Sequence, residues 1–71
     1  MKPTLTLIHI GRDSWERPVY ESDARLYVDL SPRERCYPQI CTKSGNVFDG
    51  EPDNPIREYI EIIFIPQRDT W

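Results

Sequence analysis

The sequence predicts one small, mainly β domain spanning residues 1–71, folded as a mostly antiparallel curled sheet or a partly open barrel. We expect about five or six short strands and one or two short helical turns. The apolar runs are short and rich in β-branched residues, and prolines and glycines separate them. With 71 residues, 38% hydrophobic and 30% charged, the chain has the composition of a folded domain rather than of a disordered segment.

The first and last apolar runs predict two strands that are apolar on both faces. TLTLIHI, residues 4–10, is followed by Gly11, and YIEIIFI, residues 59–65, is followed by Pro66. We expect the glycine and the proline to end these strands. A strand with apolar groups on both faces is typical of a central position, so we expect both runs inside the sheet and side by side, with parallel pairing as one arrangement.

Two hairpins are expected between these strands. In residues 17–30, Val19 and Tyr20 belong to one arm, residues 22–25 form a polar turn, and residues 26–30 form the other arm. The second arm alternates apolar and polar residues with the period of two that a half-buried strand requires. A second, shorter hairpin would pair residues 39–42 with residues 47–48 through the turn KSGN.

Two segments have the pattern of a single helical turn. SPRE, residues 31–34, has the order of a capping box, and Pro38 would stop a helix there. EPDNPIRE, residues 51–58, predicts an ordered loop or a one-turn helix with Asn54 as the N-cap and Pro55 in the first helical position.

A tetrapeptide occurs twice, as RDSW at residues 12–15 and as RDTW at residues 68–71, each time after an apolar run. We expect the aspartate to accept hydrogen bonds from amides one or two residues later and so fix a turn at the strand exit. In the favoured interpretation the turn folds Trp15 and Trp71 back as plugs over the ends of a small core. In the alternative, the two indoles are exposed and anchor a partner together with nearby arginines.

The alternative interpretation defines the candidate binding residues. They are aromatic and arginine side chains near the repeated tetrapeptides, the types that interfaces favour. They are Arg12, Trp15, Arg17, Tyr20, Arg68 and Trp71.

The charge pattern argues against polyanionic partners. The net charge is −3 and charges of both signs are interspersed, so nucleic acid and anionic membranes are disfavoured. The basic residues Arg33, Arg35 and Lys43 around Tyr37 are interpreted as a solvated edge rather than a nucleic-acid site. No run is long enough to span a membrane and the first residues do not form a secretory signal, so we expect a cytoplasmic, monomeric protein with reduced thiols.

No motif indicates catalysis, a metal or a cofactor, and we predict none of these. Cys36 and Cys41 with His9 are the only soft metal ligands, fewer than a structural zinc site requires. His9 lies within an apolar strand and is interpreted as structural. DGEPDNP, residues 49–55, alternates acids but lacks the glycine and the distal glutamate of a calcium loop.

Two blocks, GRDSWERPVYESDARLYVDL and CTKSGNVFDGEP, carry a resemblance to a known family. In their order the chain resembles a small domain found in large polyvalent proteins of conjugative elements and phages, and in short stand-alone proteins of gut Firmicutes. The resemblance covers residues 10–52 and implies an accessory or unassigned role, with no functional residues to carry over.

Together these observations favour a non-catalytic protein-interaction or accessory module of a mobile genetic element. A weak nucleic-acid-binding protein is the alternative, and a small metal-dependent hydrolase is a more remote one.

Overall fold

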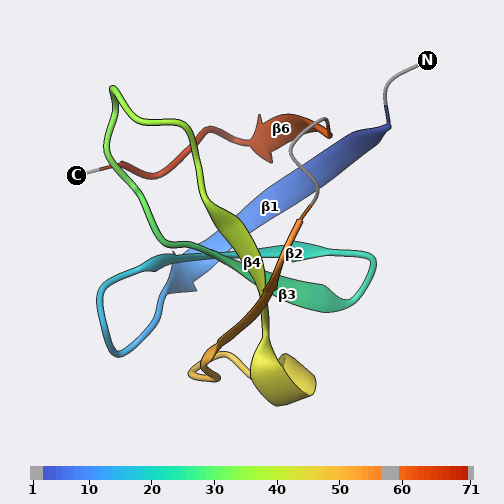
Figure 1. Ribbon diagram of the computed structural model, residues 1–71, viewed down its shortest axis with the longest axis vertical. Coiled ribbons are helices and arrows are strands. Elements are labelled where there is room, and N and C mark those ends of the chain that lie inside the picture. The colour runs from blue at the N-terminus through green and yellow to red at the C-terminus, as the bar shows by residue number, and fades with distance from the viewer. Residues whose placement is uncertain (1–2, 57–59, 71) are drawn as a thin grey trace.

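The computed structural model describes residues 3–56 and 60–70, and it confirms a mainly β fold built on one open sheet (Figure 1). The sheet has six strands in the spatial order β5-β4-β3-β2-β1-β6, so β5 and β6 are its edges. The elements are β1 Thr4–Arg12, β2 Pro18–Ser22, β3 Arg25–Asp29, β4 Ile40–Lys43, the 3-10 turn η1 Ser44–Asn46, β5 Pro52–Pro55 and β6 Glu61–Ile65. Neighbouring strands are antiparallel except β1 and β6, which are parallel. The described residues contain no α-helix.

Strand β1 lies between β2 and β6, which confirms that the first and last strands are neighbours and pair in parallel. Gly11 does not end β1 as expected; the strand continues to Arg12 through a bulge between His9 and Gly11. Gly11 has a φ of 144°, and a Cβ added there would lie 3.4 Å from the Phe48 ring. The glycine therefore permits both the bulge and the close approach of Phe48.

The first hairpin is confirmed as β2 and β3, with Ser22 paired to Arg25 across a two-residue turn. Asp23 and Ala24 both have positive φ, 50° and 64°, as a type I′ turn requires. Asn46 supports this hairpin: its Oδ1 accepts from the amide of Leu26, and its Nδ2 donates to the carbonyl of Ala24.

The second hairpin was predicted with the wrong partner. Strand β4 pairs with β3 and with β5, whereas Val47 and Phe48 lie outside any strand. The Ser44 amide donates to the carbonyl of Glu51, and the Gly50 amide donates to that of Val47. These bonds hold residues 44–51 as a compact loop. The next segment was expected to be a loop or a helical turn at residues 51–58, but its residues Pro52–Pro55 form strand β5.

The helical turn expected at SPRE is also absent. Asp29 Oδ1 accepts from the Ser31 amide at 2.9 Å, and the Arg33 and Cys36 amides then bond to the carbonyls of Ser31 and Arg33. These contacts produce successive turns rather than a helix. The buried aspartate binds the amide of the residue that would have been the N-cap.

Strand β6 lies at an edge, not at the centre as predicted. Ile62 and Phe64 pack on the core, whereas Ile63 and Ile65 on its other face are each 45% exposed. The β-branched run correctly predicted a strand. Although the strand is apolar on both faces, only one of these faces is covered. Tyr59, predicted to begin this strand, lies outside the described residues.

The core lies on the concave face of the sheet. Its buried members are Leu7, Tyr20 and Ile40. The partly buried side chains packed against them are Leu5, Tyr27, Ile56, Ile62 and Phe64. The strand registers put Val19, Val28 and Cys41 on the opposite face, where they are also buried, so the middle strands are covered on both sides.

Candidate functional site: an apolar groove beside the open strand

The turn predicted for the first tetrapeptide is present. Asp13 is 4% exposed, and its Oδ1 accepts hydrogen bonds from the amides of Trp15 and Arg17 at 2.9 and 3.0 Å. Its Oδ2 is bonded to the buried ammonium of Lys43 at 2.6 Å and to Arg17. Asp13 therefore fixes the turn and also holds this loop against the end of β4.

Trp15 is not the plug that the sequence suggested. It is 50% exposed, and the Arg17 guanidinium lies 4.7 Å from the centre of its ring. The turn carries the indole outward because the Asp13 carboxylate and Lys43 occupy the buried space beneath the loop. Trp71 lies outside the described residues, so its role as a plug stays a prediction.

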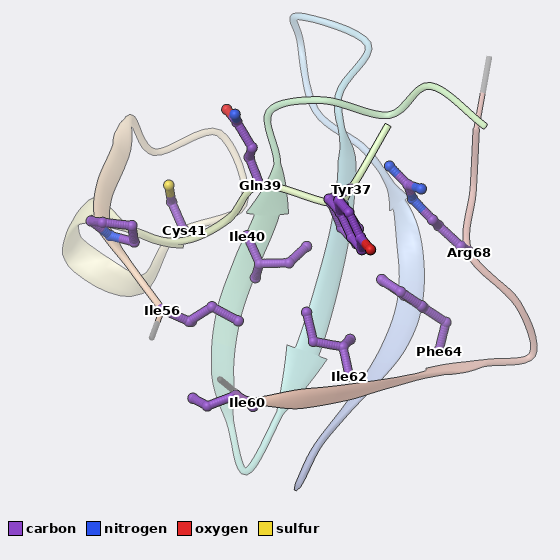
Figure 2. Close-up of a pocket in the computed structure, with 11 residues that line it drawn as sticks. Tyr37, Gln39, Ile40, Cys41, Ile56, Ile60, Ile62, Phe64 and Arg68 are labelled. Atoms are coloured by element: carbon purple, nitrogen blue, oxygen red, sulfur yellow. The ribbon is translucent and has the colours of Figure 1, made fainter. Parts of the chain in front are cut away.

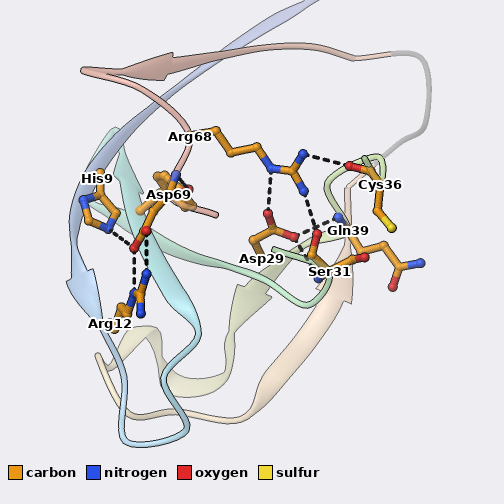
Figure 3. A network of polar contacts seen from close by, with 9 residues as sticks. His9, Arg12, Asp29, Ser31, Cys36, Gln39, Arg68 and Asp69 are labelled. Carbon is orange, nitrogen blue, oxygen red and sulfur yellow. Dashed lines mark hydrogen bonds and ion pairs between the residues drawn. The ribbon is translucent and has the colours of Figure 1, made fainter. Parts of the chain in front are cut away.

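The second tetrapeptide is built differently from the first. Among the described residues, the Asp69 carboxylate accepts hydrogen bonds from Nε and Nη2 of Arg12 at 2.9 and 2.8 Å, and the amide of Thr70 is not one of its donors. His9 Nε2 lies 3.0 Å from Asp69 Oδ2 without a well-aligned hydrogen bond. Asp69 therefore binds the C-terminal segment, residues 66–70, to β1 (Figure 3).

Arg68 attaches the same segment to the other side of the molecule. Its Nε donates to Asp29 Oδ2 at 3.2 Å, and its two terminal nitrogens donate to the carbonyls of Cys36 and Ser31 at 2.7 and 2.6 Å. Asp29 is fully buried and also accepts from the Ser31 and Gln39 amides. Figure 3 shows Arg68 and Asp69 reaching to opposite sides, so the C-terminal segment bridges two parts of the sheet.

The pKa shifts of Asp13 and Asp69 are those expected of carboxylates in structural ion pairs. Arg12 hydrogen bonding lowers the pKa of Asp69 despite the opposing effect of burial. Burial acts to raise the pKa of Asp13, but hydrogen bonds from Lys43, Arg17 and Trp15 outweigh it and leave that pKa below its ordinary value. Burial raises the pKa of the Cys41 thiol, which disfavours the reactive thiolate.

The structure does not bring the predicted binding residues together. Trp15 and Arg17 are neighbours at the surface, but Tyr20 is fully buried and cannot contact a partner, which corrects its inclusion. Arg12 and Arg68 are occupied by Asp69 and Asp29. Among the described residues, the predicted surface therefore consists of the Trp15 indole with the Arg17 guanidinium above it.

Sequence reasoning missed an apolar groove of about 1040 Å³ on the concave side (Figure 2). It lies between β6 and the β4–β5 side of the curled sheet, where a closed barrel would have continued. Figure 2 shows the side chains of Ile40, Ile56, Ile62 and Phe64 directed toward the same space. The lining residues are Tyr37, Pro38, Gln39, Ile40, Cys41, Pro55, Ile56, Ile60, Ile62, Phe64 and Arg68.

The groove has a polar, exposed end and an apolar floor. Tyr37 is 93% exposed beside it, and Arg68 is the charged residue among those that line it. The spacing of Ile60, Ile62 and Phe64 indicated one strand face in the sequence. Nothing in the sequence indicated that this face would meet Ile40 and Ile56 across a gap, because that depends on the curl of the sheet.

The described part of the chain has neither a cluster of metal ligands nor a membrane-spanning helix. Across residues 3–56 and 60–70, no three His, Cys, Asp or Glu side chains are placed to hold a metal ion. Cys36 is exposed, Cys41 is buried, and both are free thiols. Within the same part of the chain, no helix has the length and hydrophobicity to cross a membrane.

Comparison with protein-family models, with curated proteins and with solved structures finds no match to this chain. A fold of this class hosts many functions, so the fold alone does not select one. The function is therefore argued from the groove and its surroundings.

Proposed function

We propose that the chain is a non-catalytic protein-interaction module whose partner binds in the groove between β6 and the β4–β5 side of the sheet. The observation that carries this proposal is an apolar groove with a volume of about 1040 Å³, which no segment among the described residues covers. Removing such a surface from water is favourable, by about 25 cal/mol per Å² of apolar area.

The chemistry of the groove supports binding rather than catalysis. Its lining includes no carboxylate and no histidine among the described residues. Its one arginine is bonded to Asp29 and to two carbonyls, and the thiol of Cys41, which points away from the groove, has a pKa raised by burial. General acid–base or nucleophilic chemistry needs an available group at the substrate, and these side chains do not supply one.

The arrangement of the cations favours a protein partner over nucleic acid. Arg12, Arg17, Lys43 and Arg68 are each paired with a carboxylate inside the chain, which leaves Arg25, Arg33 and Arg35 as the cations of the described residues without such a pair. A nucleic-acid site needs several cations available to phosphates, and the chain carries a net charge of −3.

The biological setting that we propose is an accessory role in a mobile genetic element. Its support is the resemblance of residues 10–52 to a domain of polyvalent proteins of conjugative elements and phages. A small module with a binding groove and no evident reaction centre fits such a role.

Photo-crosslinking in the cell that encodes the chain tests the proposal. A benzophenone amino acid would replace Tyr37, beside the groove, or Val47, which is 54% exposed and does not line the groove. We expect a protein adduct from the Tyr37 position and none from Val47. Equal adducts from both positions, or no adduct from Tyr37, would contradict the proposal, and a nuclease-sensitive adduct would identify nucleic acid instead.

A further inference from the structure

We infer that the partner is an extended peptide segment that adds a strand to the free edge of β6 and places alternate apolar side chains in the groove. This inference rests on the proposed function and specifies the chemistry of the partner. It is carried by the backbone of β6, by the difference between the two sheet edges, and by the charge near the groove.

The backbone groups of β6 have a defined direction. The Glu61 amide donates to the carbonyl of Pro3, so Glu61 faces β1. Because backbone groups alternate along a strand, Ile63 and Ile65 also face β1, whereas the amides and carbonyls of Ile62 and Phe64 point to the free edge. No described residue forms a backbone hydrogen bond with Ile62 or Phe64 at that edge.

The two edges of the sheet are not equivalent. Strand β5 begins and ends with proline, at Pro52 and Pro55, which lack amide donors and so block strand addition. Strand β6 has no proline within Glu61–Ile65 and consists of β-branched and aromatic residues after Glu61. Edge protection is therefore confined to β5, and the unprotected edge is the one that borders the groove.

The side chains beside this edge fit an extended occupant. Ile62 and Phe64, whose backbone groups are free, also project into the groove (Figure 2). A strand paired with them would direct every second side chain into the same space. The groove is bounded by β6 on one side and by Ile40 and Ile56 on the other, which suits a single chain rather than a second sheet.

The charge of the loop that leads to Tyr37 selects among such peptides. Arg33 and Arg35 are exposed on this loop on either side of Glu34, which is also exposed, and neither arginine forms an ion pair with a described residue. Among the described residues that line the groove, none is acidic. We therefore assign to the peptide alternating apolar residues and an acidic group at the end near Tyr37.

Hydrogen exchange on the free protein tests the edge itself. The Ile62 and Phe64 amides should exchange at least about tenfold faster than those of Ile63 and Ile65, which bond to β1. Equal protection of all four amides would overturn the inference. Protection of Ile62 and Phe64 that rises with protein concentration would also overturn it, because a second copy would then be the occupant.

Binding is tested with random twelve-residue peptides displayed on phage, selected on the whole chain. We expect enrichment of peptides that alternate apolar residues and carry an acidic group, with binding weakened by the double variant Arg33→Glu and Arg35→Glu. Absence of enrichment, or enrichment of helical or basic peptides, would overturn the inference.

A matched pair of variants isolates the backbone contribution. Ile62→Ala and Ile62→Pro both shorten the side chain, but only the proline removes the edge donor, and it removes no bond to β1. The enriched peptide should bind Ile62→Pro about tenfold more weakly than Ile62→Ala. If the proline variant fails to fold, N-methylation of the Ile62 amide, introduced by ligation at Cys41, makes the same test with the side chain intact. Equal affinities would overturn the inference.

The two proposals fail in different ways. A Tyr37 adduct combined with Ile62 and Phe64 amides that stay unprotected in the bound state would leave the interaction module standing and remove strand addition. Selected peptides that protect these amides, without any adduct in the cell, would remove the proposed function and support only a peptide-binding capacity.

Discussion

Asp13 is the residue whose loss should affect this fold most. It is buried together with Lys43, which is 3% exposed, and it accepts the two amides that fix the loop after β1. Removing one member of a buried ion pair leaves an uncompensated charge, so Asp13→Ala should lower the free energy of unfolding by about 3–5 kcal/mol. Urea denaturation measures this change.

Asp13→Asn is the matched control for that experiment. Its side-chain oxygen can still accept from the Trp15 and Arg17 amides, but it cannot neutralise Lys43. Its loss should be smaller than that of Asp13→Ala by about 1–2 kcal/mol. Equal losses would mean that the turn hydrogen bonds contribute nothing measurable.

A substitution at Ala24, in contrast, should raise the stability of the protein. It has a φ of 64° in the two-residue turn between β2 and β3, a conformation that costs a non-glycine residue about 1–2 kcal/mol. Glycine removes this strain but is more flexible in the unfolded chain, so Ala24→Gly should stabilise the protein by about 0.5 kcal/mol. The shift in the thermal midpoint reports it, and a lower midpoint would contradict the assigned turn type.

At the scale of an element, the C-terminal segment depends on Arg68. The guanidinium makes three directed hydrogen bonds, to Asp29 and to the carbonyls of Ser31 and Cys36. Arg68→Lys keeps the charge near Asp29 but cannot reproduce this geometry, and we expect a loss of about 1–3 kcal/mol in urea denaturation. Nearly unchanged stability would show that charge neutralisation alone holds the segment.

Residues 66–70 also illustrate how one element can serve both core and groove. The Asp69 amide donates to the buried hydroxyl of Tyr20 at 2.9 Å, while Arg68 lines the groove. The segment therefore satisfies a polar atom in the core and positions one end of the candidate site. Variants in it should be checked for folding before any loss of binding is attributed to direct contact.

At the scale of the whole molecule, stability should fall in acid. The pKa values of Asp13 and Asp69 lie below the ordinary value of 3.8 in the folded state. As the pH falls below about 4, the unfolded chain takes up protons before the folded chain does. The stabilisation is therefore complete above the unfolded-state pKa and is lost as the pH falls through the folded-state values.

Urea midpoints measured between about pH 6 and about pH 3 check this dependence. Asp69→Asn should make the decline shallower, because one of the titrating carboxyls is then absent. A midpoint that stays constant over this range would contradict the assigned direction of both pKa shifts.

The sequence identified several local features and one long-range strand pairing. The first hairpin, the turn at Asp13 and the adjacency of the first and last strands follow from alternation, turn chemistry and β-branched runs. The helical turn at SPRE failed because Asp29, a residue outside the motif, binds the Ser31 amide. Local capping patterns give no information about such a competitor.

The candidate site was the least predictable part. Among the described residues, the predicted surface reduces to Trp15 and Arg17, because Tyr20 is buried and Arg12 and Arg68 bind carboxylates from other parts of the chain. The groove depends on how far the sheet curls before it stops, which no residue pattern encodes directly. Arg12 and Arg68, which were predicted to be surface groups, form ion pairs that hold distant parts of the chain together.

The prolines at the two ends of β5 also limit self-assembly. A continuous fibre formed by edge-to-edge strand pairing requires each molecule to offer two free sheet edges, and Pro52 and Pro55 block one of them. Any association between copies in crowded or partly unfolded preparations would therefore end at pairs, because β5 offers no second edge for the growth of a filament.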